Sequence, residues 1–148
     1  MNAEISPRAL IVEDEALLAL AMEDLLTAEG FQVISASTAA EVEQLALGDL
    51  AVAIVNLCLA GELAGQRVIA MLRHRIPRLP VVVVTGYSAN TPEADLRGVG
   101  WPTTRLHKPE HYEQLTAAVW AVIEQAGLGM KPLAQERRQG LGRSSVLR

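Results

Sequence analysis

The stretch Leu-Ala-Val-Ala-Ile-Val at residues 50–55 contains no polar side chain. A continuously apolar run of this length is typical of a strand that is buried on both faces, as in a parallel sheet. Four valines at residues 81–84 form a second such run, directly after Pro80. Because β-branched side chains favour strands, the two runs predict central strands of a parallel sheet.

Helical and β-prone segments alternate along the rest of the chain. Thr38, followed three residues later by Glu41, forms a capping box that predicts the start of a helix. We expect strands at residues 9–12, 31–35, 50–55, 81–84 and 103–106, and helices at residues 16–29, 38–47, 65–75 and 111–126, with a short further helix after Thr91. This alternation predicts an α/β fold with a doubly wound, five-stranded parallel sheet of order 2-1-3-4-5, flavodoxin-like, with helices on both faces.

The composition limits the possible classes of protein. The chain has 148 residues, half of them hydrophobic, and a net charge of −4, which suits one folded domain rather than a wholly disordered chain. The longest apolar run, residues 50–60, contains Asn56 and is too short to span a membrane. Residues 1–7 lack the basic end and apolar core of a signal peptide, so we expect a cytoplasmic location.

The charge divides the chain into two parts. Residues 127–148 carry five Lys or Arg residues against one acidic residue, and several glycines interrupt any regular element there. We therefore predict a domain at residues 8–126 and a flexible, basic, Gly-containing tail at residues 127–148. Because the basic residues are dispersed and aromatic residues are few, we expect no nucleic-acid partner.

Polar residues follow four of the five predicted strands. Glu13 and Asp14 follow the first strand, Asn56 the third, Thr85 the fourth and Lys108 the fifth. The carboxyl ends of parallel strands lie at one edge of the sheet, where doubly wound folds bind their ligands. We therefore predict a functional site at this edge. The alternative for Glu13 and Asp14 is that they only begin a helix favourably at its positive end.

At these residues the sequence resembles the receiver domain of two-component response regulators, over residues 8–126. Four motifs carry the resemblance at the family's intervals, namely LIVEDE at 10–15, NLCL at 56–59, TGY at 85–87 and KP at 108–109. The resemblance implies a receiver-like fold and a bacterial, non-enzymatic signalling protein of the phosphorelay that acts through protein–protein contacts. The implied partners are a histidine kinase or phosphotransfer protein, another signalling protein, or a second copy of the chain.

Asn56 occupies the phospho-acceptor position that the resemblance implies. In the family an aspartate after the third strand accepts the phosphoryl group, and transfer needs an anionic carboxylate oxygen, which a neutral amide lacks. Phosphorylation at position 56 is therefore not expected. Two interpretations stay open: a single-domain pseudo-receiver that works without phosphate, or an ordinary phospho-accepting receiver that carries an Asp-to-Asn substitution at position 56.

The resemblance also implies a Mg²⁺ site. Asp14 would bind the cation directly and Glu13 would hold one of its waters, while the Asn56 amide oxygen and the Cys58 backbone carbonyl would complete the ligand set. Oxygen ligands suit Mg²⁺, but the missing negative charge predicts weak binding. A hypothesis of another class is a small Mg²⁺-dependent phosphohydrolase with Asp14 as nucleophile, although Ala16 stands where such enzymes have a second aspartate.

Three further roles are implied by the resemblance. Lys108 would contact the phosphoryl group or the acceptor, aimed inward by a cis peptide bond to Pro109, and Thr85 would be the hydroxyl that reports phosphorylation. The family usually has an aromatic residue three positions before the lysine, where this chain has Arg105. Because an arginine cannot be buried cheaply without a partner, we expect the coupling between the pocket and the interaction surface to be altered.

Overall fold

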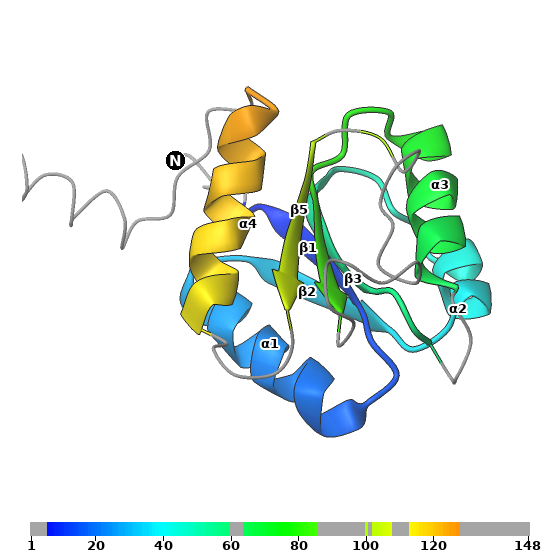
Figure 1. Cartoon of the computed structure of the whole chain (residues 1–148), viewed down its shortest axis with the longest axis horizontal. Coiled ribbons are helices and arrows are strands. Elements are labelled where there is room, and N and C mark those ends of the chain that lie inside the picture. The colour runs from blue at the N-terminus through cyan, green and yellow to red at the C-terminus, as the bar shows by residue number, and fades with distance from the viewer. Residues whose placement is uncertain (1–5, 60–63, 86–99, 101, 108–112, 128–148) are drawn as a thin grey trace, which may run out of the picture.

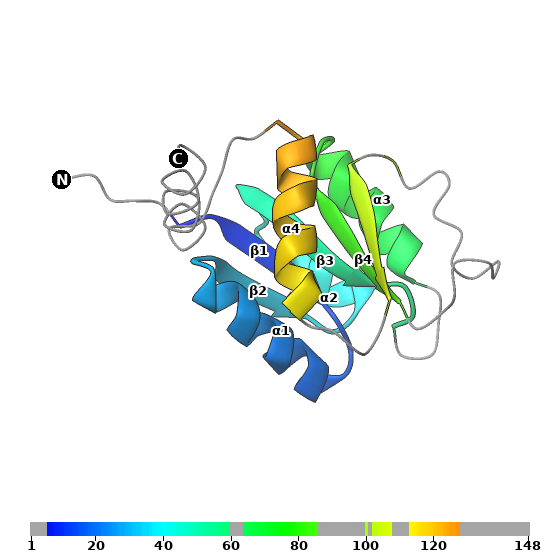
Figure 2. The same ribbon diagram turned by 60° about the vertical axis from the view of Figure 1, so that its left-hand side comes forward.

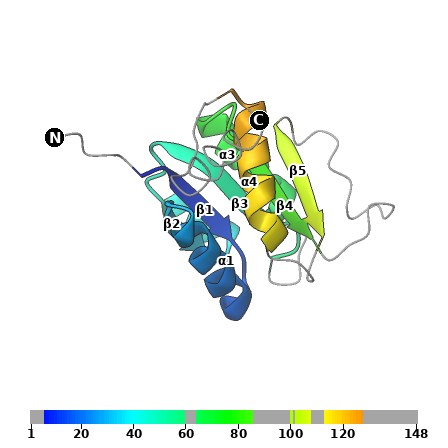
Figure 3. The ribbon, with the colours of Figure 1, turned by 90° about the vertical axis from the view of Figure 1, so that its left-hand side faces the viewer.

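The computed structural model describes residues 6–59, 64–85, 100, 102–107 and 113–127. Within them, five parallel strands form one sheet in the order β2-β1-β3-β4-β5. The strands are β1 (Arg8–Val12), β2 (Gln32–Ala36), β3 (Leu50–Asn56), β4 (Val81–Thr85) and β5 (Thr103–His107), and Figure 3 shows them side by side. The predicted fold class and strand order are confirmed.

Helices cover both faces of the sheet, as predicted. They are α1 (Ala16–Ala28), α2 (Ala39–Gln44), α3 (Gly65–Arg75) and α4 (Glu113–Gln125). α1 and α4 lie on one face and α2 and α3 on the other (Figure 1), and a turned view places α1 and α4 in front of the sheet with α3 behind it (Figure 2). The helix expected after Thr91 and residues 128–148 of the predicted tail lie outside the described residues.

Among the described residues, no helix is both long enough and apolar enough to cross a membrane.

The central strands supply two hydrophobic cores, one on each face of the sheet. In β3, Val52 and Ile54 pack into the core under α1 and α4, whereas Ala53 and Val55 pack into the core under α2 and α3. All seven residues of β3 are buried, because the side chains of a strand alternate between faces and both faces are covered. This arrangement explains why residues 50–55 are apolar without alternation.

α2 begins as predicted but ends early. Thr38 Oγ1 accepts a hydrogen bond from the Glu41 N–H (3.1 Å), and the Glu41 carboxylate accepts from the N–H and hydroxyl of Ser37 (2.9 and 2.8 Å). The predicted end near Leu47 is wrong, because the backbone is already extended at Leu45. Leu47 is buried in the core after the helix has ended, so its burial offsets the loss of another helical turn.

Arg73 ties the end of α3 to the sheet. Its Nη1 donates to Thr103 Oγ1 (3.0 Å), and its Nη2 donates to the carbonyl oxygens of Leu79 (3.0 Å) and Pro102. These contacts join α3 to the segments that precede β4 and begin β5. Partial burial lowers the pKa of the Arg73 guanidinium from its usual value. We call this group of four residues the Arg73 clasp.

A second contact joins the two helices of the opposite face. Trp120 of α4 lies 4.9 Å from the Phe31 ring, centroid to centroid, and its Nε1 donates a hydrogen bond to Glu29 Oε1 (3.1 Å). Since Glu29 and Phe31 flank the turn between α1 and β2, this contact fixes α4 against that turn.

Candidate functional site

Three buried polar side chains lie at the carboxyl ends of neighbouring strands. Glu13 directly follows β1, Asn56 ends β3 and Thr85 ends β4, and they are 2%, 5% and 1% exposed. They make up the buried polar and charged side chains of the described part of the chain. Because such groups are costly to bury, their concentration at the predicted edge marks it as the candidate functional site.

Glu13 and Asn56 are joined directly by hydrogen bonds. Asn56 Nδ2 lies 3.1 Å from each of the two Glu13 carboxylate oxygens. Glu13 Oε2 also accepts a hydrogen bond from the Glu15 N–H at the start of α1 (3.0 Å). The buried carboxylate is thus held by donors from two separate segments of the chain. We call Glu13, Asn56, Glu15 and Cys58 the Asn56 network.

The orientation of the Asn56 amide follows from its two neighbours. Asn56 Oδ1 accepts a hydrogen bond from the Cys58 N–H (3.1 Å), while Nδ2 faces the Glu13 carboxylate. A backbone N–H can only donate and a carboxylate can only accept. The opposite orientation would place two donors together and two acceptors together, so the hydrogen-bonding partners select the observed one.

Gly65 brings α3 against the backbone of this site. A Cβ atom at position 65 would lie 2.5 Å from Leu57 Cα and 2.6 Å from the Asn56 carbonyl oxygen. The Gly65 N–H donates a hydrogen bond to the Leu57 carbonyl (2.9 Å). The sequence predicted only that a helix begins here, and a glycine at the first position of a helix was the available signal of close backbone approach.

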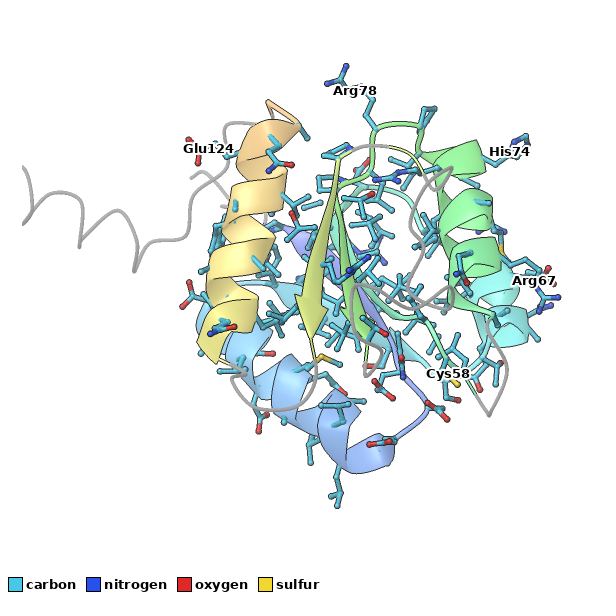
Figure 4. The ribbon with its side chains drawn as sticks, in the orientation of Figure 1. Cys58, Arg67, His74, Arg78 and Glu124 are labelled. Atoms are coloured by element: carbon cyan, nitrogen blue, oxygen red, sulfur yellow. The ribbon has the colours of Figure 1, made fainter. Side chains whose placement is uncertain are left out.

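The remaining predicted residues differ in where they lie. Asp14 is exposed and Cys58 is half-buried at the same edge, and Figure 4 shows Cys58 at this lower end of the molecule. Arg105 is half-buried in β5, opposite Val83 in the sheet register.

Lys108 and Pro109 lie outside the described residues, so their predicted role and peptide geometry stay predictions.

Comparison with known proteins identifies the family. The family model of the response regulator receiver domain matches residues 9–120. The chain belongs to the response regulator receiver domain family. As a receiver domain, it is a module of two-component signalling.

Three relatives illustrate the similarity. The chain is 33% identical over 151 residues to the alginate biosynthesis transcriptional regulatory protein AlgB of Pseudomonas aeruginosa, covering 97% of this chain and 32% of AlgB. It therefore spans less than half of the length of that relative. A response regulator receiver protein from Sinorhizobium medicae WSM419 is 26% identical, with a TM-score of 0.67, covering 82% of this chain and 97% of that one. The response regulator TrrA of Thermotoga maritima, in complex with Mg²⁺-BeF, is 20% identical with a TM-score of 0.66, covering 78% and 98% of the two chains, and shares the fold.

Receiver domains typically bind Mg²⁺, a cation that prefers oxygen ligands in octahedral geometry. Carboxylates such as Glu13 and Asp14 are suitable ligands. Asn56, however, presents its nitrogen to Glu13 and uses its oxygen to accept from the Cys58 N–H. Within the described ranges, no group of three or more His, Cys, Asp or Glu side chains is arranged to hold a metal ion. The four predicted ligands therefore do not fit Mg²⁺ as a set in this arrangement.

Proposed function

We propose that this receiver domain of the phosphorelay acts through protein–protein contacts and is not phosphorylated at position 56. The observation that carries the proposal is the neutral amide of Asn56, buried at the end of β3 and bonded to Glu13. In a receiver domain this strand end is where the acceptor aspartate is expected. The proposal therefore assigns position 56 to the acceptor position, and this chain itself accepts no phosphoryl group there, either as a pseudo-receiver or as an ordinary receiver that carries one substitution.

The chemistry of phosphoryl transfer supports the absence of phosphorylation. The acceptor must supply an anionic oxygen nucleophile, and the Asn56 oxygen is neutral and engaged with the Cys58 N–H. The Glu13 carboxylate is buried and accepts hydrogen bonds from Asn56 and Glu15. The proposed function does not depend on Mg²⁺.

We propose that this function takes place in the cytoplasm, where phosphorelay kinases present their phosphohistidine.

The surface of α1 supports a protein partner. Leu17 and Leu20, one helical turn apart, are 84% and 54% exposed, and large exposed apolar side chains that cluster on a surface are typical of interaction sites. Exposed acidic residues, Asp14, Glu15 and Asp24, lie near them along the chain. The occupant that fits is a helical surface of a histidine kinase or phosphotransfer protein with apolar residues and a basic rim, because a second copy would oppose acid with acid.

Phosphorylation at position 56 can be tested with a small phosphodonor. The wild-type chain, Asn56→Asp and the neutral control Asn56→Gln are incubated with acetyl phosphate and MgCl₂, and intact mass is measured. We expect a phosphoryl adduct, base-labile as an acyl phosphate is, in Asn56→Asp alone. An adduct on the wild-type chain would overturn the proposal. Ready phosphorylation of Asn56→Asp would favour an ordinary receiver that carries one substitution, whereas an unmodified Asn56→Asp protein would favour a pseudo-receiver whose pocket no longer supports phosphoryl transfer.

The contact surface has its own test. The double variant Leu17→Ser/Leu20→Ser should bind histidine phosphotransfer domains and kinase dimerisation domains about tenfold more weakly than wild type. Its melting temperature should fall by only a few degrees, through the lower helix propensity of serine, because both leucines are exposed. Ala28→Ser, at an exposed position near the far end of α1, is the matched control. Equal binding by all three proteins would contradict the surface, and tighter self-association of wild type alone would favour a second copy as the occupant.

Enzymatic activity is the remaining alternative. An aryl phosphate assay should show no turnover, and turnover that Asp14→Ala abolishes would favour the phosphohydrolase hypothesis instead.

A further inference from the structure

The Glu13 carboxylate is a charged group that is almost completely removed from water. At 2% exposure it needs compensating contacts, because an ionised carboxylate is costly to bury. Three contacts supply N–H groups to it: Asn56 Nδ2 at 3.1 Å from Oε1, the same atom at 3.1 Å from Oε2, and the Glu15 N–H at 3.0 Å from Oε2. A divalent cation beside such a carboxylate would perform the same electrostatic task.

The Asn56 amide competes with a cation for the space beside Glu13. An amide nitrogen carries no lone pair suited to metal binding, so a cation between residues 13 and 56 would need the Asn56 oxygen turned toward it. Turning the amide would break both contacts to Glu13 and the hydrogen bond from the Cys58 N–H. It would also place the amide NH₂ group against the Cys58 N–H, donor against donor. Three favourable contacts are thus lost for one new ligand.

We propose that the Asn56 amide takes the place of the divalent cation in this receiver domain, so that the pocket keeps its geometry without metal and is indifferent to Mg²⁺. The inference rests on the proposed function only in assigning residue 56 to the acceptor position. It makes Asn56 a positioning residue: its two contacts hold Glu13, and Glu13 in turn accepts from the Glu15 N–H that begins α1. The pocket and the start of α1 are therefore coupled through one neutral side chain.

Replacement of the amide by a carboxylate should restore the need for a cation. An aspartate at position 56 would place a second negative oxygen close to Glu13, where Nδ2 now lies 3.1 Å from both carboxylate oxygens. Two like charges at such a distance in a poorly solvated site repel strongly. A cation between them would turn that repulsion into two attractive contacts. The same pocket is thus expected to be independent of metal with Asn56 and dependent on metal with aspartate.

The experiment compares melting temperatures with and without magnesium. Wild type, Asn56→Asp and Glu13→Gln/Asn56→Asp are melted in EDTA, in about 10 mM MgCl₂, and in NaCl at matched ionic strength, which controls for screening. Wild type should melt at the same temperature in MgCl₂ and in the matched NaCl. Asn56→Asp should melt at least about 5 °C lower than wild type in EDTA and recover most of that loss in MgCl₂ only.

The double variant separates repulsion from a general packing defect. Glu13→Gln removes the opposing charge, so Glu13→Gln/Asn56→Asp should regain stability in EDTA and lose most of the response to MgCl₂. This variant also keeps the test decisive if Asn56→Asp alone does not fold. A magnesium-specific rise in wild type as large as that of Asn56→Asp would overturn the inference. An Asn56→Asp protein as stable as wild type in EDTA would do the same.

The two proposals fail separately. A phosphoryl group on the wild-type chain after incubation with acetyl phosphate contradicts the proposed function, and it is detected as an increase in intact mass. A wild-type chain that MgCl₂ stabilises as much as it stabilises Asn56→Asp contradicts the metal-replacing role of Asn56, and the melting temperature measures this.

Discussion

At each end of the strands, neutral groups of the protein contact a charged side chain, which is partly buried at one end and almost fully buried at the other. At one edge, the Arg73 guanidinium donates to a threonine hydroxyl and two backbone carbonyls. At the other, the Glu13 carboxylate accepts from a backbone N–H and from the side-chain amide of Asn56. Each of these named partners is neutral. Hydrogen-bonding dipoles of the protein thus contact a charge at both ends of the strands.

The Arg73 clasp and the Asn56 network differ in whether the partners of the charged group are backbone atoms or a side chain that a substitution can change. Two acceptors of the Arg73 clasp are backbone carbonyls, which every residue type supplies, so that edge depends mainly on Arg73 itself. In the Asn56 network, a change from amide to carboxylate at one position converts a donor into an acceptor beside Glu13. The Arg73 edge therefore suits a structural joint, whereas the Asn56 edge can change function through one side chain.

Removal of Arg73 should have the largest effect on stability. Arg73→Ala leaves the carbonyls of Leu79 and Pro102 without their guanidinium donor and releases α3 from β5. Since several hydrogen bonds to a charged group are lost together, we expect the free energy of unfolding to fall by about 3 kcal/mol. Urea denaturation measures this change.

Two further variants test whether the loss of stability comes from the hydrogen bonds of the Arg73 guanidinium. Arg73→Lys keeps the charge but cannot reproduce the planar fork, so it should fall between wild type and Arg73→Ala. Arg67→Ala removes an exposed arginine from the same helix and should change stability by less than about 0.5 kcal/mol. If Arg73→Ala were no more harmful than Arg67→Ala, the clasp would contribute nothing and the comparison between edges would fail.

The Asn56 edge can be disturbed through its backbone by Gly65→Ala. Alanine favours helices over glycine by about 1 kcal/mol, but here its Cβ would lie 2.5 Å from Leu57 Cα, so α3 must move away from the site. We expect a net loss of about 2 kcal/mol in urea denaturation, in the range of overpacking.

Ala70→Gly is the matched reverse substitution, at an exposed position of the same helix. It should cost about 1 kcal/mol, following helix propensity. Stabilisation by Gly65→Ala would show that propensity outweighs the close approach to Leu57.

The sheet was predictable because its pattern depends on short stretches of sequence. Residues 50–55 and 81–84 are apolar throughout, and β3 and β4 are buried on both faces. The strand order placed Glu13, Asn56 and Thr85 at one edge, where the structure buries all three. The limits of α2 were less predictable, since burial of Leu47 depends on a core assembled from distant elements.

The direction of the Asn56 amide was beyond the reach of sequence analysis. The predicted role of its oxygen as a metal ligand came from the family, whereas the oxygen's contact is decided by the Cys58 N–H two residues later. The Arg73 clasp was missed for a similar reason: Thr103 and Pro102 lie about thirty residues from Arg73, a separation over which no periodicity connects them. Local patterns predict elements, while such contacts require the assembled fold.

The smallest predicted effect concerns Glu41, an exposed counterpart of Glu13. Both carboxylates accept from a nearby backbone N–H and from a second donor, which for Glu41 is the Ser37 hydroxyl. These hydrogen bonds from Ser37 lower the pKa of Glu41. A carboxyl group whose pKa is lower in the folded state stabilises the protein above its unfolded pKa, and the contribution is lost as the pH falls through the folded pKa. Glu41→Gln should therefore lower the melting temperature by no more than about 2 °C near neutral pH, with the difference vanishing in acid.

Ser37→Ala should reproduce part of this pH-dependent difference, because it removes the hydroxyl donor and keeps the backbone N–H. Glu43→Gln takes one carboxylate from the same short helix and serves as the control. If Glu41→Gln and Glu43→Gln changed the melting temperature equally from acid to neutral pH, the loss of general negative charge would explain both. If only Glu41→Gln shows the acid-sensitive difference, two hydrogen-bond donors are enough to stabilise an ionised carboxylate that is exposed to water. The much larger effect expected of Asn56→Asp then follows from burial, since the Glu13 carboxylate lacks the solvent that surrounds Glu41.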